Sequence, residues 1–322
     1  MASTLLCLAL PAWGQLPPRS RSVPVQPLPL GVGNQWIYVE RGRFAAEQPV
    51  TVEVKAASVQ RGSTYYQLTG FASEDAWVRY NALGELVALD PAGGPDRLWY
   101  AFGAPEGFSW RPQLPEACLD QARLASRTAE VRVPAGAFRP SILIQYNPGP
   151  CADAGFSEEA FALGIGLLRR TAITIAGPRT LELAFARIDG VALTVPEVHF
   201  SLAIDRPRYS SNLMPIPVLT ARLTIRNTSA LPLTLDFSSG QRYDLAIRDS
   251  AGRQVYLWSE GKAFILVLGR LELSPGEQVY LVEVPLADRN NRPFAAGRYT
   301  LEAWLTTVGG KAYSATIPFE LQ

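Results

Sequence analysis

The feature that most constrains the fold of this chain is an alternation of apolar and polar residues from Leu219 to Arg226. An apolar side chain stands at every second position, and Thr or Arg fills the positions between them. A period of two puts all apolar side chains on one face of an extended strand, whereas a helix needs a period of 3.6. The pattern therefore predicts a β-strand with one buried face.

Similar alternation recurs between Val191 and Gln322, in short stretches separated by Gly, Pro, Asn and Ser. The further stretches cover residues 233–237, 243–247, 279–281, 299–305 and 313–319. About seven or eight short strands at such spacing are typical of a β-sandwich. Pro318 cannot donate a hydrogen bond to a neighbouring strand, so we expect the last strand to lie at a sheet edge.

The preceding part of the chain, residues 30–190, also consists of short alternating stretches joined by Gly- and Pro-containing turns. Val50, Val52 and Val54, for example, share one face of a predicted strand. The run Phe161–Leu168 is expected to form a buried strand, and residues 157–161 could form one helical turn. A chain of 322 residues can hold two cores. The sequence thus predicts an all-β protein with an N-terminal β-rich meander domain of unknown role (30–190), followed by a C-terminal β-sandwich (191–322).

The N-terminus predicts a signal peptide over residues 1–14, with small residues at Ala12 and Gly14 before a cleavage site at Gln15. The alternative is a frayed tail without function. The Pro-rich residues 15–29 are expected to form an extended linker. The apolar run is too short to span a bilayer, which needs ~20 residues, and no other stretch of the sequence qualifies. These features predict a secreted or periplasmic protein without a transmembrane segment.

Of the three cysteines, Cys7 would leave with the signal peptide, and Cys118 and Cys151 would remain. An even pair in an exported protein predicts one disulfide. Closing this loop of roughly 33 residues would stabilise the fold by about 3 kcal/mol. The alternative is two unrelated buried thiols.

Composition argues against several classes of function. A net charge of +1 disfavours a nucleic-acid partner, because phosphate binding needs a basic face. The chain has one histidine, His199, and no Gly-x-Ser-x-Gly motif, so a Ser-His-Asp triad is not expected. One His and two paired Cys would not make a zinc site. The sequence predicts no enzyme, catalytic residue, metal or cofactor, and it does not indicate an oligomeric state.

Six short motifs between Asn227 and Trp304 together resemble one known family. They are Asn227-Thr228, Ser239-Gly240-Gln241-Arg242-Tyr243-Asp244, Asp249-Ser250-Ala251-Gly252, Trp258-Ser259-Glu260-Gly261-Lys262-Ala263-Phe264, Leu273-Ser274-Pro275-Gly276-Glu277 and Ala296-Gly297-Arg298-Tyr299-Thr300. In this order and spacing they resemble the BsuPI-type intracellular proteinase inhibitors. The resemblance covers roughly a third of the chain and implies an immunoglobulin-like sandwich. For the founding members it implies inhibition of an intracellular serine protease of the subtilisin type. This chain departs from the founding members in two ways: we expect it to be exported, and it carries an added N-terminal domain.

Two loops within these motifs are the candidate partner-binding site. Trp258 falls out of phase with Val255 and Leu257, so alternation places its ring opposite the core, where it could anchor a protein partner. Alternatively, Trp258 packs on the neighbouring strand at Tyr243 and makes the loop rigid. The candidate residues are Gln241, Arg242, Tyr243, Trp258, Ser259, Lys262 and Phe264.

The sequence therefore predicts a non-enzymatic, proteinase-inhibitor-like binding protein that acts on a subtilisin-type serine protease outside the cytoplasm. An alternative is a structural or adhesive envelope module that docks to a protein or glycan through the sandwich. A weaker alternative is a hydrolase that uses the N-terminal β domain.

Overall fold

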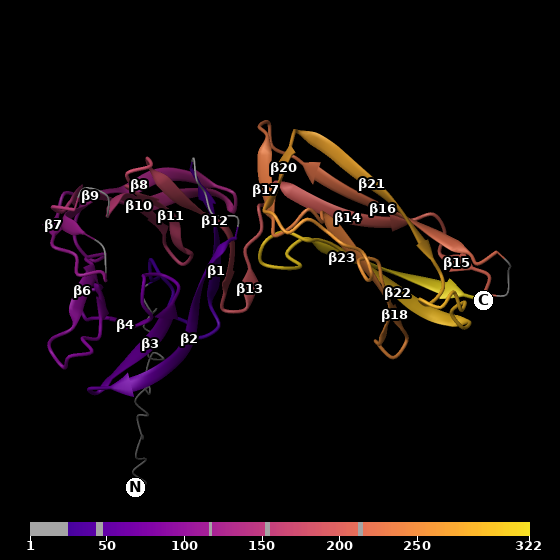
Figure 1. The fold of residues 1–322 in the computed structure, drawn as a ribbon, viewed down its shortest axis with the longest axis horizontal. Coiled ribbons are helices and arrows are strands. Elements are labelled where there is room, and N and C mark those ends of the chain that lie inside the picture. The colour runs from indigo at the N-terminus through magenta and orange to yellow at the C-terminus, as the bar shows by residue number, and fades with distance from the viewer. Residues whose placement is uncertain (1–24, 43–47, 116–117, 152–154, 212–214) are drawn as a thin grey trace, which may run out of the picture.

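The computed structural model describes residues 25–42, 48–115, 118–151, 155–211 and 215–322. Within these ranges the chain forms strands and turns but no helix, so the predicted all-β class is confirmed (Figure 1). The predicted signal peptide and most of the predicted linker lie outside the described residues.

The N-terminal part forms one sheet of 13 strands. These strands are β1 (Gln35–Arg41), β2 (Val50–Gln60), β3 (Ser63–Thr69), β4 (Ala76–Tyr80), β5 (Leu86–Ala88), β6 (Arg97–Tyr100), β7 (Ser109–Trp110), β8 (Leu119–Val133), β9 (Gly136–Pro148), β10 (Phe156–Ala162), β11 (Gly166–Ala172), β12 (Arg179–Ile188) and β13 (Val191–Ala192). The order is β6-β5-β4-β3-β2-β1-β12-β11-β10-β9-β8-β7, and β13 pairs with β12. The first strand thus lies beside the twelfth, in the middle of the sheet.

This sheet curves strongly, as Figure 1 shows for the indigo and magenta strands, and its two edges meet. The Trp110 indole on β7 donates a hydrogen bond of 3.2 Å to the Trp99 carbonyl on β6. The core lies inside the curve, where β1 contributes the fully buried rings of Trp36 and Tyr38. The Tyr38 hydroxyl donates to the Leu167 carbonyl at 2.9 Å, which satisfies its polar end inside this core.

Three local expectations for this part of the chain were wrong. Leu28, in the predicted linker, is fully buried in the core, and its N–H donates to the Tyr80 hydroxyl at 3.0 Å. The expected helical turn at 157–161 belongs to strand β10. The run Phe161–Leu168 is a hairpin and not one strand, because Gly164 turns the chain at φ 75° between β10 and β11.

The C-terminal part forms three separate sheets. Its strands are β14 (Val198–Ile204), β15 (Arg208–Tyr209), β16 (Val218–Asn227), β17 (Leu233–Phe237), β18 (Tyr243–Asp249), β19 (Gln254–Leu257), β20 (Gly269–Leu273), β21 (Gly276–Pro285), β22 (Gly297–Leu305) and β23 (Ser314–Leu321). The sheets have the orders β14-β16-β21, β15-β23-β22-β18-β19 and β17-β20.

The first two of these sheets share one apolar core, which is consistent with an immunoglobulin-like sandwich. The predicted inner face of β16 is fully buried from Leu219 to Ile225, so the alternation that defined this strand is confirmed. Pro318 pairs only with β22, at Thr300, while the far end of β23 also pairs with the two residues of β15. The last strand is therefore an edge strand along most of its length.

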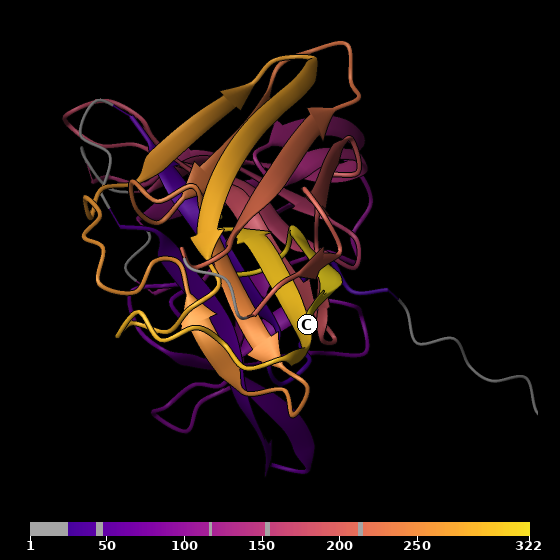
Figure 2. The ribbon, with the colours of Figure 1, turned by 90° about the vertical axis from the view of Figure 1, so that its right-hand side faces the viewer.

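The two parts of the chain meet where β1 and β12 face β17 and the loop before β23 (Figure 1). Seen from the other end, the C-terminal part lies in front of the N-terminal sheet (Figure 2). Ile37, Phe185 and Val308 form a small buried apolar cluster there. Beside it, the Arg41 guanidinium binds both carboxylate oxygens of Asp236 at 2.9 and 2.7 Å. The Asp236 side chain is only 2% exposed, so its negative charge is buried at this contact. The ion pair with Arg41 compensates for the loss of hydration.

Candidate protein-binding surface

Four of the predicted site residues form one continuous stack, which we call the Trp258 stack: Tyr243, Trp258, Lys262 and Phe264. The rings of Tyr243 and Trp258 lie 4.8 Å apart, and those of Trp258 and Phe264 lie 6.1 Å apart. The Lys262 ammonium group lies 3.2 Å from the centre of the indole, in cation–π geometry. Trp258 is partly buried against the sandwich core, as in the packing alternative. The stack therefore holds the loop after β19 in one conformation.

Ser259 fixes the start of this loop through a buried carboxylate. Its N–H and its hydroxyl donate to the two oxygens of Asp244 at 3.0 and 2.5 Å. Asp244 is buried on β18, and it also accepts a hydrogen bond from the Leu245 N–H at 2.9 Å. Ser259 thus has a structural partner that accounts for its position.

Gln241 and Arg242 lie beside the stack, and their side chains are not part of it. The Gln241 amide donates to the Tyr243 carbonyl at 3.0 Å. The Arg242 guanidinium lies 4.7 Å from the ring centre of Phe237 and donates to the Ser239 carbonyl at 3.1 Å. The structure therefore brings four of the seven candidate residues together in the stack. It places Gln241 and Ser259 beside the stack and directs Arg242 toward Phe237 of β17.

Electrostatically, the stack carries one cation at its outer end. Burial lowers the pKa of the Lys262 ammonium group, and the Asp244 carboxylate acts in the opposite direction. Burial also raises the pKa of the Tyr243 phenol, so this ring stays neutral at physiological pH. A partner would meet a positively charged, partly aromatic surface here.

An exposed apolar segment follows the stack directly, and the sequence analysis did not identify it. Ile265, Leu266 and Val267 are 75%, 76% and 45% exposed. Neither helix nor strand is formed from Lys262 to Leu268, and we call residues 262–268 the Ile265 loop. Consecutive exposed aliphatic side chains on a folded surface are typical of interaction sites.

The Ile265 loop is held at its middle and at both ends. The Gly240 N–H donates to the Ile265 carbonyl at 2.8 Å. Phe264 packs in the Trp258 stack at one end, and Leu268 packs at the other on the cluster of Ile37, Phe185 and Val308, to which both parts of the chain contribute. Both parts of the chain therefore support this loop and keep its apolar side chains in solvent.

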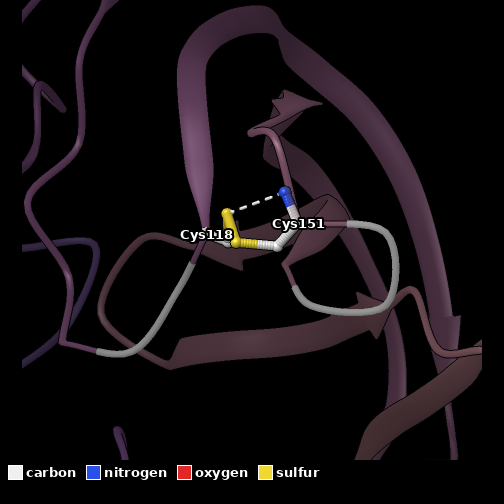
Figure 3. The surroundings of a disulfide bond; sticks show 2 residues. All are labelled: Cys118 and Cys151. Atoms are coloured by element: carbon white, nitrogen blue, oxygen red, sulfur yellow. Dashed lines mark hydrogen bonds between the residues drawn. A yellow bond between two sulfur atoms is a disulfide. The ribbon is translucent and has the colours of Figure 1, made fainter.

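The remaining predicted residues lie in other places. The sulfur atoms of Cys118 and Cys151 are 2.05 Å apart beside the open ends of β8 and β9 (Figure 3). This geometry is that of a disulfide, and the bond in the isolated protein stays a prediction. His199 lies exposed on β14, opposite Arg226 of β16. Among the described residues, no three His, Cys, Asp or Glu side chains gather closely enough to hold a metal ion. The described ranges also contain no helix that could cross a membrane.

Three solved structures resemble part of this chain at a distance. A β-glucosidase from Erythrobacter marinus is 16% identical over 41% of this chain and 16% of its own, with a TM-score of 0.25. The DNA glycosylase AlkC of Pseudomonas fluorescens is 21% identical over 39% of this chain and 30% of its own, with a TM-score of 0.26. The sporulation control protein Spo0M of Bacillus subtilis is 12% identical over 39% and 49%, with a TM-score of 0.24. This chain thus spans less than half of any of these three proteins. Among curated proteins, none matches this chain.

A sequence family does match, over residues 213–310, and its description is "BsuPI: Intracellular proteinase inhibitor". The matched segment contains the whole Trp258 stack and the Ile265 loop. The resemblance expected from the six sequence motifs is therefore confirmed. Because the family is intracellular, the expectation of a secreted or periplasmic protein was wrong. The C-terminal third of this chain matches the BsuPI intracellular proteinase inhibitors, a family that acts by binding and not by catalysis.

Proposed function

We propose that this chain is a proteinase-inhibitor-like binding protein, and that the Ile265 loop is its contact with a serine protease of the subtilisin type. One observation carries the proposal: the matched segment exposes Ile265, Leu266 and Val267 in a row. Proteases bind extended segments in a cleft, through backbone hydrogen bonds and pockets for alternate side chains. A segment without regular structure, with apolar side chains in solvent, has the chemistry that such a cleft accepts.

The supports of the loop favour inhibition over simple cleavage. A flexible substrate loses conformational freedom on binding, whereas a loop held by Gly240, Phe264 and Leu268 has already lost much of it. Because both ends of the loop are packed on the rest of the protein, the loop would keep its position even if the protease cleaved one of its peptide bonds. The Trp258 stack would then act mainly as a support and as the rim of the interface.

The expected gain from the apolar side chains follows from their exposure. Complete burial of an Ile or Leu side chain stabilises a complex by about 1.5–3 kcal/mol. With three quarters of each side chain exposed, Ile265 and Leu266 can each contribute about 1–2 kcal/mol on binding. Truncation of either to Ala should thus weaken inhibition by about 5- to 30-fold.

The test is a titration of subtilisin activity with the purified full-length chain and its variants. Leu266→Asp should abolish the stoichiometric loss of protease activity, because a carboxylate would enter an apolar pocket. Leu231→Asp is the matched control, since Leu231 is also exposed (58%) and also lies in the matched segment. The control should inhibit like the wild type.

Two outcomes would overturn the proposal. Undiminished subtilisin activity at a large excess of intact protein would remove this protease type as the partner. Equal inhibition by Leu266→Asp and wild type would remove the Ile265 loop as the contact.

A further inference from the structure

The N-terminal sheet contains a hollow that the proteinase-inhibitor function does not use. Its volume is about 600 Å³, within the range of about 300–1,000 Å³ that is usual for small-molecule sites. Most of its wall is apolar. The apolar side chains include Val50, Phe71, Leu114, Phe156, Ile173 and Leu181.

One buried charged residue, Arg170 of β11, also lines this hollow, and its side chain is only 9% exposed. Its Nε donates to Glu159 at 2.6 Å, one terminal nitrogen donates to the Phe71 carbonyl at 2.6 Å, and the other donates to the Tyr100 hydroxyl at 3.4 Å. A guanidinium has five N–H groups. Within the described residues, these bonds leave one N–H on each terminal nitrogen.

The surroundings of Arg170 restrict what those two N–H groups can bind. The rings of Phe71 and Phe156 lie 4.5 and 4.4 Å from the guanidinium carbon and cover it. A ligand must therefore reach the edge of the guanidinium, in its plane, where a carboxylate binds best. Arg170 stays positively charged, because the Glu159 carboxylate lies beside its guanidinium. The same carboxylate also accepts a hydrogen bond from the Tyr146 hydroxyl.

A second guanidinium, that of Arg179, lies at the rim of the same hollow and pairs with Glu40. Glu40 lines the hollow as well and offsets the charge of Arg179, so the charge preference of the hollow rests on the two remaining N–H groups of Arg170. These N–H groups and the apolar wall complement a molecule with one negatively charged end and one apolar end.

We propose that this hollow binds a small amphiphile, namely a carboxylate with an aliphatic body, whose carboxylate contacts Arg170. The aliphatic part lies against the wall formed by Phe71, Leu114 and Leu181. This site belongs to the N-terminal sheet and is independent of the Ile265 loop. It gives the added part of the chain a ligand-binding role.

Isothermal titration of the full-length chain with decanoate and with nonylammonium tests the charge preference. Both carry the same nine-carbon alkyl chain, so the apolar wall alone would not separate them. We expect decanoate to bind at least ten times more tightly. No detectable decanoate binding at about 1 mM, or equal binding of the two compounds, would overturn the proposal.

Two variants test the location. Ala172→Trp fills the hollow from β11, and Ser73→Trp fills it from an exposed turn that tolerates substitution more easily. Ile175→Trp is the control, because Ile175 is 86% exposed and is not part of the wall. The two filling variants should weaken decanoate binding at least tenfold, and the control should not. If the folded filling variants bind decanoate like the wild type, the site is not this hollow.

Discussion

Replacement of Trp258 by Ala should destabilise the C-terminal sandwich, because the Trp258 ring supports the loop that follows it. Buried aromatic side chains remove about 150–250 Å² from solvent, and Trp258 is partly buried between Tyr243 and Phe264. At about 25 cal/mol per Å², the loss of roughly half to two thirds of this area corresponds to about 3 kcal/mol. The lost cation–π contact with Lys262 would add about 0.5–1 kcal/mol.

The assay is thermal unfolding of the full-length chain, followed by near-ultraviolet circular dichroism, beside a subtilisin titration at a temperature where the variant is folded. A loss of 3 kcal/mol should lower the Tm by at least ~6 °C. Trp258→Phe keeps a ring on Tyr243 and should lose much less. Lys262→Met removes only the charge, so its Tm should change by about 2 °C or less.

The folded fraction of Trp258→Ala should still inhibit, since the proposed contact is made by Ile265 and Leu266 and not by Trp258. An unchanged Tm combined with lost inhibition would refute this reasoning. The ring of Trp258 would then be a direct anchor for the partner.

Reduction of the Cys118–Cys151 disulfide should lower the free energy of unfolding by about 3 kcal/mol, because the bond links residues 33 apart in the unfolded chain. Peptide mapping without reductant should recover one linked peptide, and two alkylatable thiols would contradict the bond. Burial raises the pKa of the Tyr313 phenol to about 12. In the unfolded chain this phenol ionises near pH 10, whereas in the folded chain it stays protonated up to about pH 12. The resulting stabilisation is complete below about pH 10 and is lost as the pH rises to 12, by roughly 3 kcal/mol. Denaturant titrations of Tyr313→Phe should show a shallower alkaline loss. Limited proteolysis should cut at the turn Asp189–Gly190 and release a folded C-terminal fragment. The fragment should melt at a lower temperature than the full chain, because Val308 and Asp236 lose their contacts with the N-terminal sheet. Rapid degradation of this fragment would contradict the division.

Strands with one buried face and one solvent-exposed face were predictable from the sequence. Leu219 and Leu223 alternate with Thr and Arg because one side of β16 packs on the core and the other faces water. The hairpin at Gly164 was not predictable in the same way, because both of its strands are buried and their sequence shows no alternation. An unbroken apolar run does not reveal where it turns.

The site was only partly predictable for a related reason. The stacking of Trp258 on Tyr243 follows from strand neighbours, and the sequence analysis named it as one of two alternatives. Leu266, in contrast, stands in a run that reads as a buried strand, and only the fold shows it to be exposed. The Arg41–Asp236 pair joins residues 195 positions apart, a separation at which local pattern carries no information.

The pairing of β1 with β12 has a consequence for synthesis on the ribosome. Glu40 and Arg179, which face each other across these strands, are 139 residues apart. At about 5–20 residues per second, the ribosome needs roughly 7–30 s to make β12 after β1 has emerged. During this time β1 can pair only with β2, and its other edge remains open to nascent neighbours. Expression yield should therefore depend on chaperones that cover exposed strand edges, more than the stability of the finished fold would suggest.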